Sequence, residues 1–333
     1  MGNTLFHHFS HKGKSAALNS LEEAFQASKK SGFVWLDFED PTQEALAPLT
    51  EKFGIHPLSI DDCIDEDQIP KMDVFPEYSF ILFNYYTYEN KALSIDELDL
   101  MIAPNFLITV HGHHSKISDF FSKLPDLIER SIAESSKGPD YLMHTILDYI
   151  VDKKFHAIEK LQDEIDLSEE SIHKDAVNYS PTELIRIRNC LLSLRKSLFH
   201  EREILIKICR KDSPVISDKV IFYYRDIYDH LAKFFEFIEI EREMISNLFE
   251  LFLSIRNNQL AELSIQANET MKKLTLITTI FMPLTLLAGI GGMSEWSMMT
   301  GAENWKIAYP VFMVIMGGFA FFNYLFLKWI KWI

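Results

Sequence analysis

The sequence predicts an α+β cytoplasmic domain, followed by a long helical bundle or stalk and a C-terminal two-helix transmembrane hairpin. Residues 274–293 and 307–327 contain no charged side chain, and each stretch is about 20 residues long, enough for a helix to cross about 30 Å of hydrocarbon. Before them, short strand-like runs give way to a stretch with almost no helix breaker. The expected divisions are 1–135, 136–271, 272–293, 294–306 and 307–333.

The first division alternates strand-like and helical patterns, which indicates an α/β layer domain. The strand-like runs are Phe33–Leu36, Tyr78–Tyr88, Leu98–Ile102 and Phe106–Val110. The helical runs are Leu18–Ser31, Gln43–Phe53 and Ser118–Ala133. Residues 1–14 are polar, contain histidines and lack an apolar centre, so they are not expected to be a signal peptide.

Three long helices are expected in the second division. No glycine or proline occurs in 140–180, 182–213 or 215–282, so Pro181 and Pro214 separate the helices. The third helix continues into the first membrane span and would be about 100 Å long. Its apolar side chains recur at helical spacing, at Leu231, Phe235, Ile238, Ile245, Leu248, Phe252 and Ile255. This pattern predicts a stalk that packs against copies of itself; the alternative is an intramolecular bundle.

The charges that flank the two spans predict their orientation. Lys272 and Lys273 precede the first span, and Lys328 and Lys331 follow the second. The loop at 294–306 holds Glu295 and Glu303, with Lys306 as its one lysine. Because positive residues remain on the cytoplasmic side, a multi-pass protein of the cell (inner) membrane with both termini in the cytoplasm is expected.

The first span carries polar and thioether side chains along one helix face. Positions 268, 275 and 282, together with 271, 278 and 285, alternate by three and four residues and therefore share a face. We call this set the stripe; it consists of Asn268, Met271, Thr275, Thr278, Met282 and Thr285. Two helices cannot enclose a path, so the stripe predicts that several copies surround a common axis. Alternatively, the threonines bond to their own helix and help helices to pack.

Motifs along nearly the whole chain resemble those of the CorA family of divalent-cation channels. The first helix supplies Asn268–Thr275, Phe281–Thr285, Ala288–Ile290 and Gly292-Met293. The soluble part supplies Trp35–Asp37, Phe53–Leu58, Asp61-Asp62, Gln68, Pro70-Lys71 and Asn105–His111. Each motif is weak alone, but their order, followed by a C-terminal hairpin, is specific.

The resemblance implies a homopentameric channel. Met271 and Leu274 would then form an apolar constriction at the inner end of the pore, and divalent cations bound between cytoplasmic domains would close it. The implied pore-lining set is Asn268, Met271, Leu274, Thr275, Thr278, Met282 and Thr285. Mg²⁺ uptake is the expected activity, with the cation as cargo or regulator rather than as a resident cofactor.

The chain departs from the family at the outer mouth. Where the family has Gly-Met-Asn, with an asparagine ring that meets hydrated Mg²⁺, this chain has Gly292, Met293 and Ser294. A serine hydroxyl also accepts hydrogen bonds from a water shell, but it reaches less far. Glu295 and Glu303 are expected to attract cations to this mouth. Zn²⁺, Co²⁺ or Ni²⁺ transport remains an alternative to Mg²⁺, as does a non-conducting membrane scaffold.

Composition restricts the remaining function classes. The formal net charge is −15, which argues against nucleic acid as a partner because phosphate binding needs a basic face. The three cysteines are far apart and form no paired motif, which is typical of reduced thiols. The chain lacks a phosphate-binding loop, a dinucleotide fingerprint, a nucleophile elbow and an H-E-x-x-H motif, so no enzyme is expected.

Three polar clusters have a metal-binding or cation-attracting alternative, but the positions of any metal sites stay open. His111, His113 and His114 follow a strand without a helical i, i+4 spacing or a nearby cysteine. The acidic run at 61–67 and the acidic positions at 163–170 are expected to be solvated helix surfaces. The expected partners are therefore further copies of the chain, membrane lipid and divalent cations.

Overall fold

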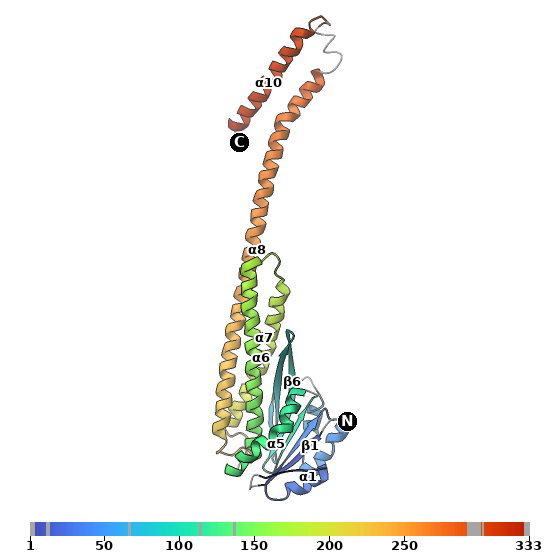
Figure 1. Cartoon of the computed structure of the whole chain (residues 1–333), viewed down its shortest axis with the longest axis vertical. Helices are drawn as coiled ribbons and strands as arrows, with labels where there is room; N and C mark the ends of the chain where they lie inside the picture. The colour runs from blue at the N-terminus through green and yellow to red at the C-terminus, as the bar shows by residue number, and fades with distance from the viewer. Residues whose placement is uncertain are drawn as a thin grey trace. The chain divides into compact units, whose positions relative to one another are not determined.

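The computed structural model describes residues 4–10, 14–65, 68–112, 115–135, 138–291, 301 and 303–329. The chain forms two compact units, Met1–Phe252 and Leu253–Ile333. The first unit contains a sheet and long helices, and the second contains the apolar helices near the C-terminus (Figure 1).

A seven-stranded mixed sheet organises the first unit. Its order is β2-β1-β3-β7-β6-β5-β4. The strands are β1 (Thr4–Phe9), β2 (Ser15–Ala17), β3 (Phe33–Glu39), β4 (Met72–Val74), β5 (Ser79–Glu89), β6 (Ala92–Ala103) and β7 (Phe106–His111). Only β3 and β7 pair in parallel among these described strands, and the other pairs are antiparallel.

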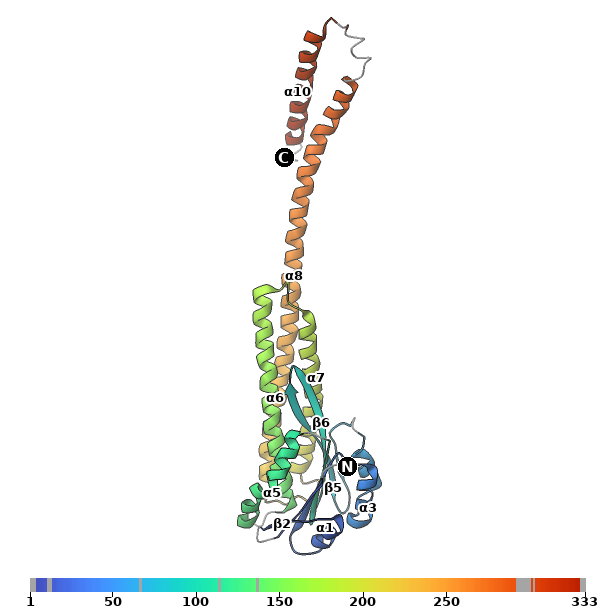
Figure 2. The ribbon, with the colours of Figure 1, turned by 45° about the vertical axis from the view of Figure 1, so that its right-hand side comes forward.

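The two faces of the sheet are covered by different helices (Figure 2). Because side chains alternate along a strand, Val34, Leu36 and Phe38 of β3 pack into a core with the short helices. These helices are α1 (Leu21–Ser28), α2 (Gln43–Leu46), α3 (Pro48–Phe53) and α4 (Pro57–Asp62). On the opposite face, Trp35 meets Phe121 of α5 (Ser115–Ser135) edge to face at 5.6 Å between ring centroids.

Long helices pack beside this opposite face. Helix α6 (Pro139–Asp175) contacts β5, β6 and β7, and α7 (Pro181–Cys209) contacts α6 and β5. Helix α8 (Ile221–Gly291) has 71 residues, and Leu231, Ile238 and Ile245 in its first part are buried. The prolines at the starts of α6 and α7 occupy the first helical turn, where the missing N–H costs no hydrogen bond.

The second unit contains the end of α8 and helix α10 (Trp305–Trp329). Both helices contain a stretch that is apolar and long enough to cross a membrane. Most of their apolar side chains are exposed in the single chain. The predicted α+β domain, long helices and paired C-terminal spans are therefore present.

Several elements differ from the sequence expectations. Strand β1 forms within residues 1–14, which were expected only to lack a signal peptide, and β2 and β4 were not anticipated. The single helix expected at 43–53 is two helices, because Pro48 begins a new one. Helices α6 and α7 also pack on the sheet within the first compact unit.

Candidate functional site

The stripe lies on the part of α8 that belongs to the second unit. Its members Asn268, Met271, Thr278, Met282 and Thr285 are exposed, as is the neighbouring Leu274. Thr275 is half-buried. Because these residues share one uninterrupted helix, their heptad spacing places a continuous row of small, polar and thioether groups along it.

The threonine hydroxyls of α8 bond to the backbone of the preceding turn. Thr275 donates to the carbonyl oxygen of Met271 at 2.8 Å, and Thr278 donates to that of Leu274 at 2.8 Å. Thr285 makes the equivalent bond to Phe281. This is the local bonding that the alternative interpretation expected. A hydroxyl that donates in this way keeps its acceptor lone pairs, so the bond satisfies the donor without removing its capacity to meet water.

Gly289 extends the stripe by one further heptad step from Met282. No atom lies within 4 Å of the position that a Cβ would occupy at Gly289. Together with Met282, Thr285, Leu286 and Ile290 it lines an open hollow on the helix surface. The sequence interpretation counted Gly289 among the family motifs but did not assign it to the stripe, because a glycine has no side chain to reveal its face. Its position seven residues after Met282 marks it.

Two contacts connect α8 and α10 within the second unit. The side-chain amide of Asn323 donates to the carbonyl oxygen of Thr279 at 3.2 Å. At Gly291, an added Cβ would lie 2.7 Å from the ring of Phe312, so a larger residue there would require this ring to shift. A hydrogen bond from a side-chain amide and a close helix approach at a small residue are both typical of helix pairs in membranes.

The predicted outer mouth is only partly described. Gly292, Met293, Ser294 and Glu295 lie outside the described residues. Glu303 is exposed in a turn directly before α10, and Lys306 is exposed in the first turn of that helix. The side chain of Glu303 is therefore free of the buried part of the second unit.

His111 belongs to a buried network in the first unit. Its Nε2 lies 3.5 Å from Oδ2 of Asp37, and the Thr109 hydroxyl donates to the same carboxylate. Burial lowers the pKa of His111, but bonding to Asp37 outweighs it and leaves the pKa above its ordinary value. Trp35 donates to the Thr109 hydroxyl at 3.1 Å, so the network joins adjacent strands. His113 and His114 lie outside the described residues.

The acidic positions are mostly solvated or paired with polar side chains. Asp61 is exposed at the end of α4, whereas Asp62 accepts from Lys71 at 2.7 Å and from Gln68 at 2.8 Å. Glu164 departs from the expected solvated surface because it pairs with Arg186. Within the described ranges, no group of three or more histidine, cysteine, aspartate or glutamate side chains is arranged to hold a metal ion.

Comparison with known proteins adds to this geometry. Residues 30–328 match the family described as CorA-like Mg²⁺ transporter protein. The chain is 33% identical over 287 residues to the cobalt/magnesium transport protein CorA of Thermotoga maritima, which covers 85% of this chain and 78% of the relative. It is 30% identical over 281 residues to the putative metal ion transporter YfjQ of Bacillus subtilis, covering 83% and 82%.

A solved structure has the same fold. The complete structure of the CorA magnesium transporter from Methanocaldococcus jannaschii matches with a TM-score of 0.70 and 22% identity, covering 99% of this chain and 98% of that one. The similarity therefore extends through the sheet, the long helices and the C-terminal spans.

Proposed function

We propose that this chain, which belongs to the CorA-like Mg²⁺ transporter family, carries divalent cations across a membrane, with Mg²⁺ as its main substrate. The two relatives described above are named as metal-ion transport proteins, one for cobalt and magnesium. The family is one of transporters, and no enzymatic activity is part of the proposal.

One observation carries the proposal: the exposed stripe, most of which lies on the uncharged span of α8. A helix that only anchors a protein in lipid has no physical reason to align Thr275, Thr278 and Thr285 with Met271 and Met282 at heptad spacing. Lipid cannot hydrate these groups, whereas an aqueous path along an axis can. The open position of Gly289 supports the same interpretation, since a small residue leaves space for water.

A path of this kind requires several copies of the chain. We propose a homo-oligomer, most simply a pentamer as the family resemblance implies, held by residues 215–290. The exposed apolar side chains of the second unit, among them Leu274 and Ile277, would then contact other copies or membrane lipid. The proposal is a multi-pass protein of the cell inner membrane with both termini in the cytoplasm, an orientation that Lys272, Lys273 and Lys328 favour.

The inner end of the first span carries apolar side chains that suit a gate. Met271 and Leu274 are exposed at the start of the uncharged span, directly around Lys272 and Lys273. A ring of such side chains excludes water and blocks ions without a physical plug. Divalent cations that bind between the cytoplasmic domains would favour the closed ring when the internal concentration is high.

Ser294 favours a second candidate, a carrier of Zn²⁺, Co²⁺ or Ni²⁺ with the same fold. A ring of serine hydroxyls reaches the water shell of Mg²⁺ less closely than a ring of asparagine amides does. This mouth would therefore discriminate less sharply among divalent cations. Ser294→Asn is then expected to narrow selectivity toward Mg²⁺, and Glu295→Gln to lower flux mainly at low ionic strength, where charges are least screened. A non-conducting scaffold is the remaining candidate.

Flux into liposomes that contain only this protein tests the proposal. Parallel assays with Mg²⁺, Zn²⁺, Co²⁺ and Ni²⁺, with and without a proton gradient, distinguish the two transport candidates. Flux above that of empty liposomes is expected for Mg²⁺. Absence of flux for all four ions, in protein shown by native mass spectrometry to be assembled, would exclude both transport candidates and favour the non-conducting scaffold.

A further inference from the structure

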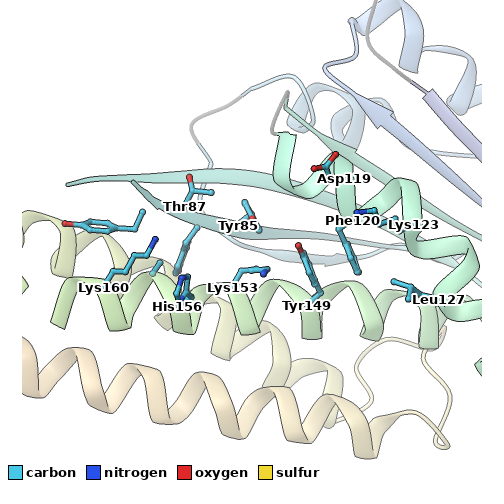
Figure 3. Close-up of a pocket in the computed structure, with 13 residues that line it drawn as sticks. Tyr85, Thr87, Asp119, Phe120, Lys123, Leu127, Tyr149, Lys153, His156 and Lys160 are labelled. Carbon is cyan, nitrogen blue, oxygen red and sulfur yellow. The ribbon is translucent and has the colours of Figure 1, made fainter. Parts of the chain in front are cut away.

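A cavity in the first unit, separate from the stripe, is lined by rings and lysines (Figure 3). Its volume is about 460 Å³. Strand β5 supplies Tyr85–Tyr88, α5 supplies one wall and α6 supplies the other. The lining residues used below are Tyr85, Asp119, Phe120, Lys123, Tyr149, Lys153, His156 and Lys160. A volume of this size suits a small molecule.

The helix spacing explains why one face of α6 is basic and aromatic at this cavity. Tyr149, Lys153, His156 and Lys160 follow one another by four, three and four residues, so they share a face. Figure 3 shows Lys153 and Lys160 lying between α6 and the overlying strand. The chain as a whole carries a formal charge of −15, so this local surplus of lysines is contrary to its overall charge.

The lysines of the cavity are not neutralised within the part of the chain that the structure describes. Lys123, Lys153 and Lys160 are exposed and form no ion pair with a described residue. Asp119 is the one carboxylate among the lining residues. Lys153 lies 5.2 Å from the ring centroid of Tyr149, which leaves its ammonium group at the cavity wall. Three cations around a small space attract a polyanion.

The aromatic side chains provide flat surfaces next to these cations. Phe120 and Tyr149 stack with their ring centroids 3.7 Å apart and their planes 1° from parallel, which joins α5 to α6. Tyr85 is buried beside them, and burial raises its pKa to about 12, so its hydroxyl remains a hydrogen-bond donor at neutral pH. Both rings of this stack remain partly exposed, so a planar heterocycle can pack against the surfaces that the stack leaves uncovered.

We propose that this cavity is a binding site for a nucleoside polyphosphate. The phosphates would lie against Lys153 and Lys160, and the base would lie against the aromatic wall, beside which Figure 3 shows Lys123. Asp119 is placed at the rim, where a carboxylate accepts hydrogen bonds from ribose hydroxyls or an exocyclic amine. Duplex nucleic acid does not fit the cavity, and the acidic remainder of the chain would repel it. Binding here does not depend on ion transport.

Calorimetric titration of the full-length chain in lipid nanodiscs tests the proposal. ATP, inorganic triphosphate and adenosine are titrated separately in buffer with EDTA, so that metal chelation by ATP adds nothing to the signal. Saturable binding of about one ATP per chain is expected, with weaker binding of triphosphate, which lacks the base, and of adenosine, which lacks the charge. Absence of saturable ATP binding, or triphosphate binding as tight as ATP, would overturn the proposal.

Variants locate the site. Lys153→Gln combined with Lys160→Gln is expected to weaken ATP binding at least about tenfold, since two charge-assisted contacts are lost. Lys196→Gln removes an exposed lysine of α7 away from the cavity and is expected to leave binding unchanged. Tyr149→Leu is expected to weaken ATP binding but not triphosphate binding, whereas Tyr149→Phe retains both. Parental ATP affinity in the double lysine variant would exclude this cavity.

Discussion

Helix α8 belongs to both compact units, and its apolar side chains are buried in the first unit but exposed in the second. In the first unit Leu231, Ile238 and Ile245 are at most 1% exposed. In the second unit Met271 is 61% exposed and Met282 is 66% exposed. The first part also carries many charged side chains on its other faces, whereas residues 274–291 carry none, so the helix changes from an amphipathic to an uncharged surface.

The difference shows what each part requires to be stable. The first part of α8 buries its apolar side chains against α6 and α7 of the same chain. The second part exposes more contiguous apolar surface than a soluble monomer usually does. It therefore needs contact with lipid, with further copies of the chain, or with both. Substitutions in the first unit should change folding, whereas equivalent ones in the second unit should change transport or assembly.

The largest effect is expected at the buried ion pair of the first unit. The ammonium of Lys154 pairs with the carboxylate of Glu201, and both side chains are fully buried. Lys154→Met should lower the free energy of unfolding by about 3–5 kcal/mol, because it leaves a buried carboxylate unpaired. Denaturant unfolding of the purified chain measures the change.

A surface pair provides the control for this prediction. Arg195 and Glu239 also form an ion pair, but their side chains are 44% and 39% exposed. Arg195→Met should cost less than about 1 kcal/mol. Adding Glu201→Gln to Lys154→Met should recover part of the lost stability, since the amide is neutral. Equal losses at the two pairs would contradict the difference in burial.

The second prediction compares two isoleucines of α8. Ile238 is fully buried, whereas Ile277 is 53% exposed. Ile238→Ala should lower the free energy of unfolding by about 2–5 kcal/mol because it leaves a cavity. Ile277→Ala should change the same quantity by less than about 1 kcal/mol. If both variants unfold at the parental denaturant concentration, the first part of α8 does not contribute to the core as described.

The third prediction concerns transport rather than folding. Met271→Asp should raise divalent-cation flux on the order of tenfold, most clearly at high internal cation concentration, since carboxylates hydrate a constriction from which apolar side chains exclude water. Liposome flux measures this, and Met271→Leu is the matched control that keeps the ring apolar. Parental flux in a correctly assembled Met271→Asp variant would remove Met271 from the gate.

The smallest effect is expected from the buried His111 network. Bonding to Asp37 raises the pKa of His111 above its unfolded value of about 6.5. Its protonated form therefore stabilises the folded chain fully below about pH 6.5, and this contribution is lost as the pH rises through the folded pKa. The melting temperature of His111→Gln should fall further below that of the parent at about pH 5.5 than at about pH 8.5.

A polar residue of the second unit sharpens this comparison. Thr278→Val changes an exposed side chain that does not titrate, so its effect on the melting temperature should be the same at both pH values. A pH-independent difference for His111→Gln would show that its bond to Asp37 does not depend on charge.

Much of the fold was predictable because its signals are local. The prolines at 181 and 214 separate long helices, and the expected strands at 78–88 and 106–110 match β5 and β7 within one residue at each end. Strand β1 was not predictable in this way, because Thr4, His7 and His8 give no apolar alternation. It forms through pairing with β3, and the ring of His7 stacks on Trp35 at 6.0 Å.

The two candidate sites also differ in whether their sequence signals are local. The stripe was predictable because all its members lie on one helix with a fixed period. The cavity with Lys153 was not, because its walls come from β5, α5 and α6, which the chain brings together only on folding. The roles of Ser294 and its neighbours remain predictions.

The sheet has two edges, and both bear on aggregation. Strands β2 and β4 at the edges are only three residues long, so little free edge is offered to another chain there. Beyond β4, strand β5 would offer a longer edge, but the backbone N–H of Asn84 donates to Glu201 at 3.0 Å instead. Helix α7 thereby occupies a hydrogen-bonding position that a foreign strand would need. A chain proposed to assemble through helices is in this way protected from polymerising through its sheet.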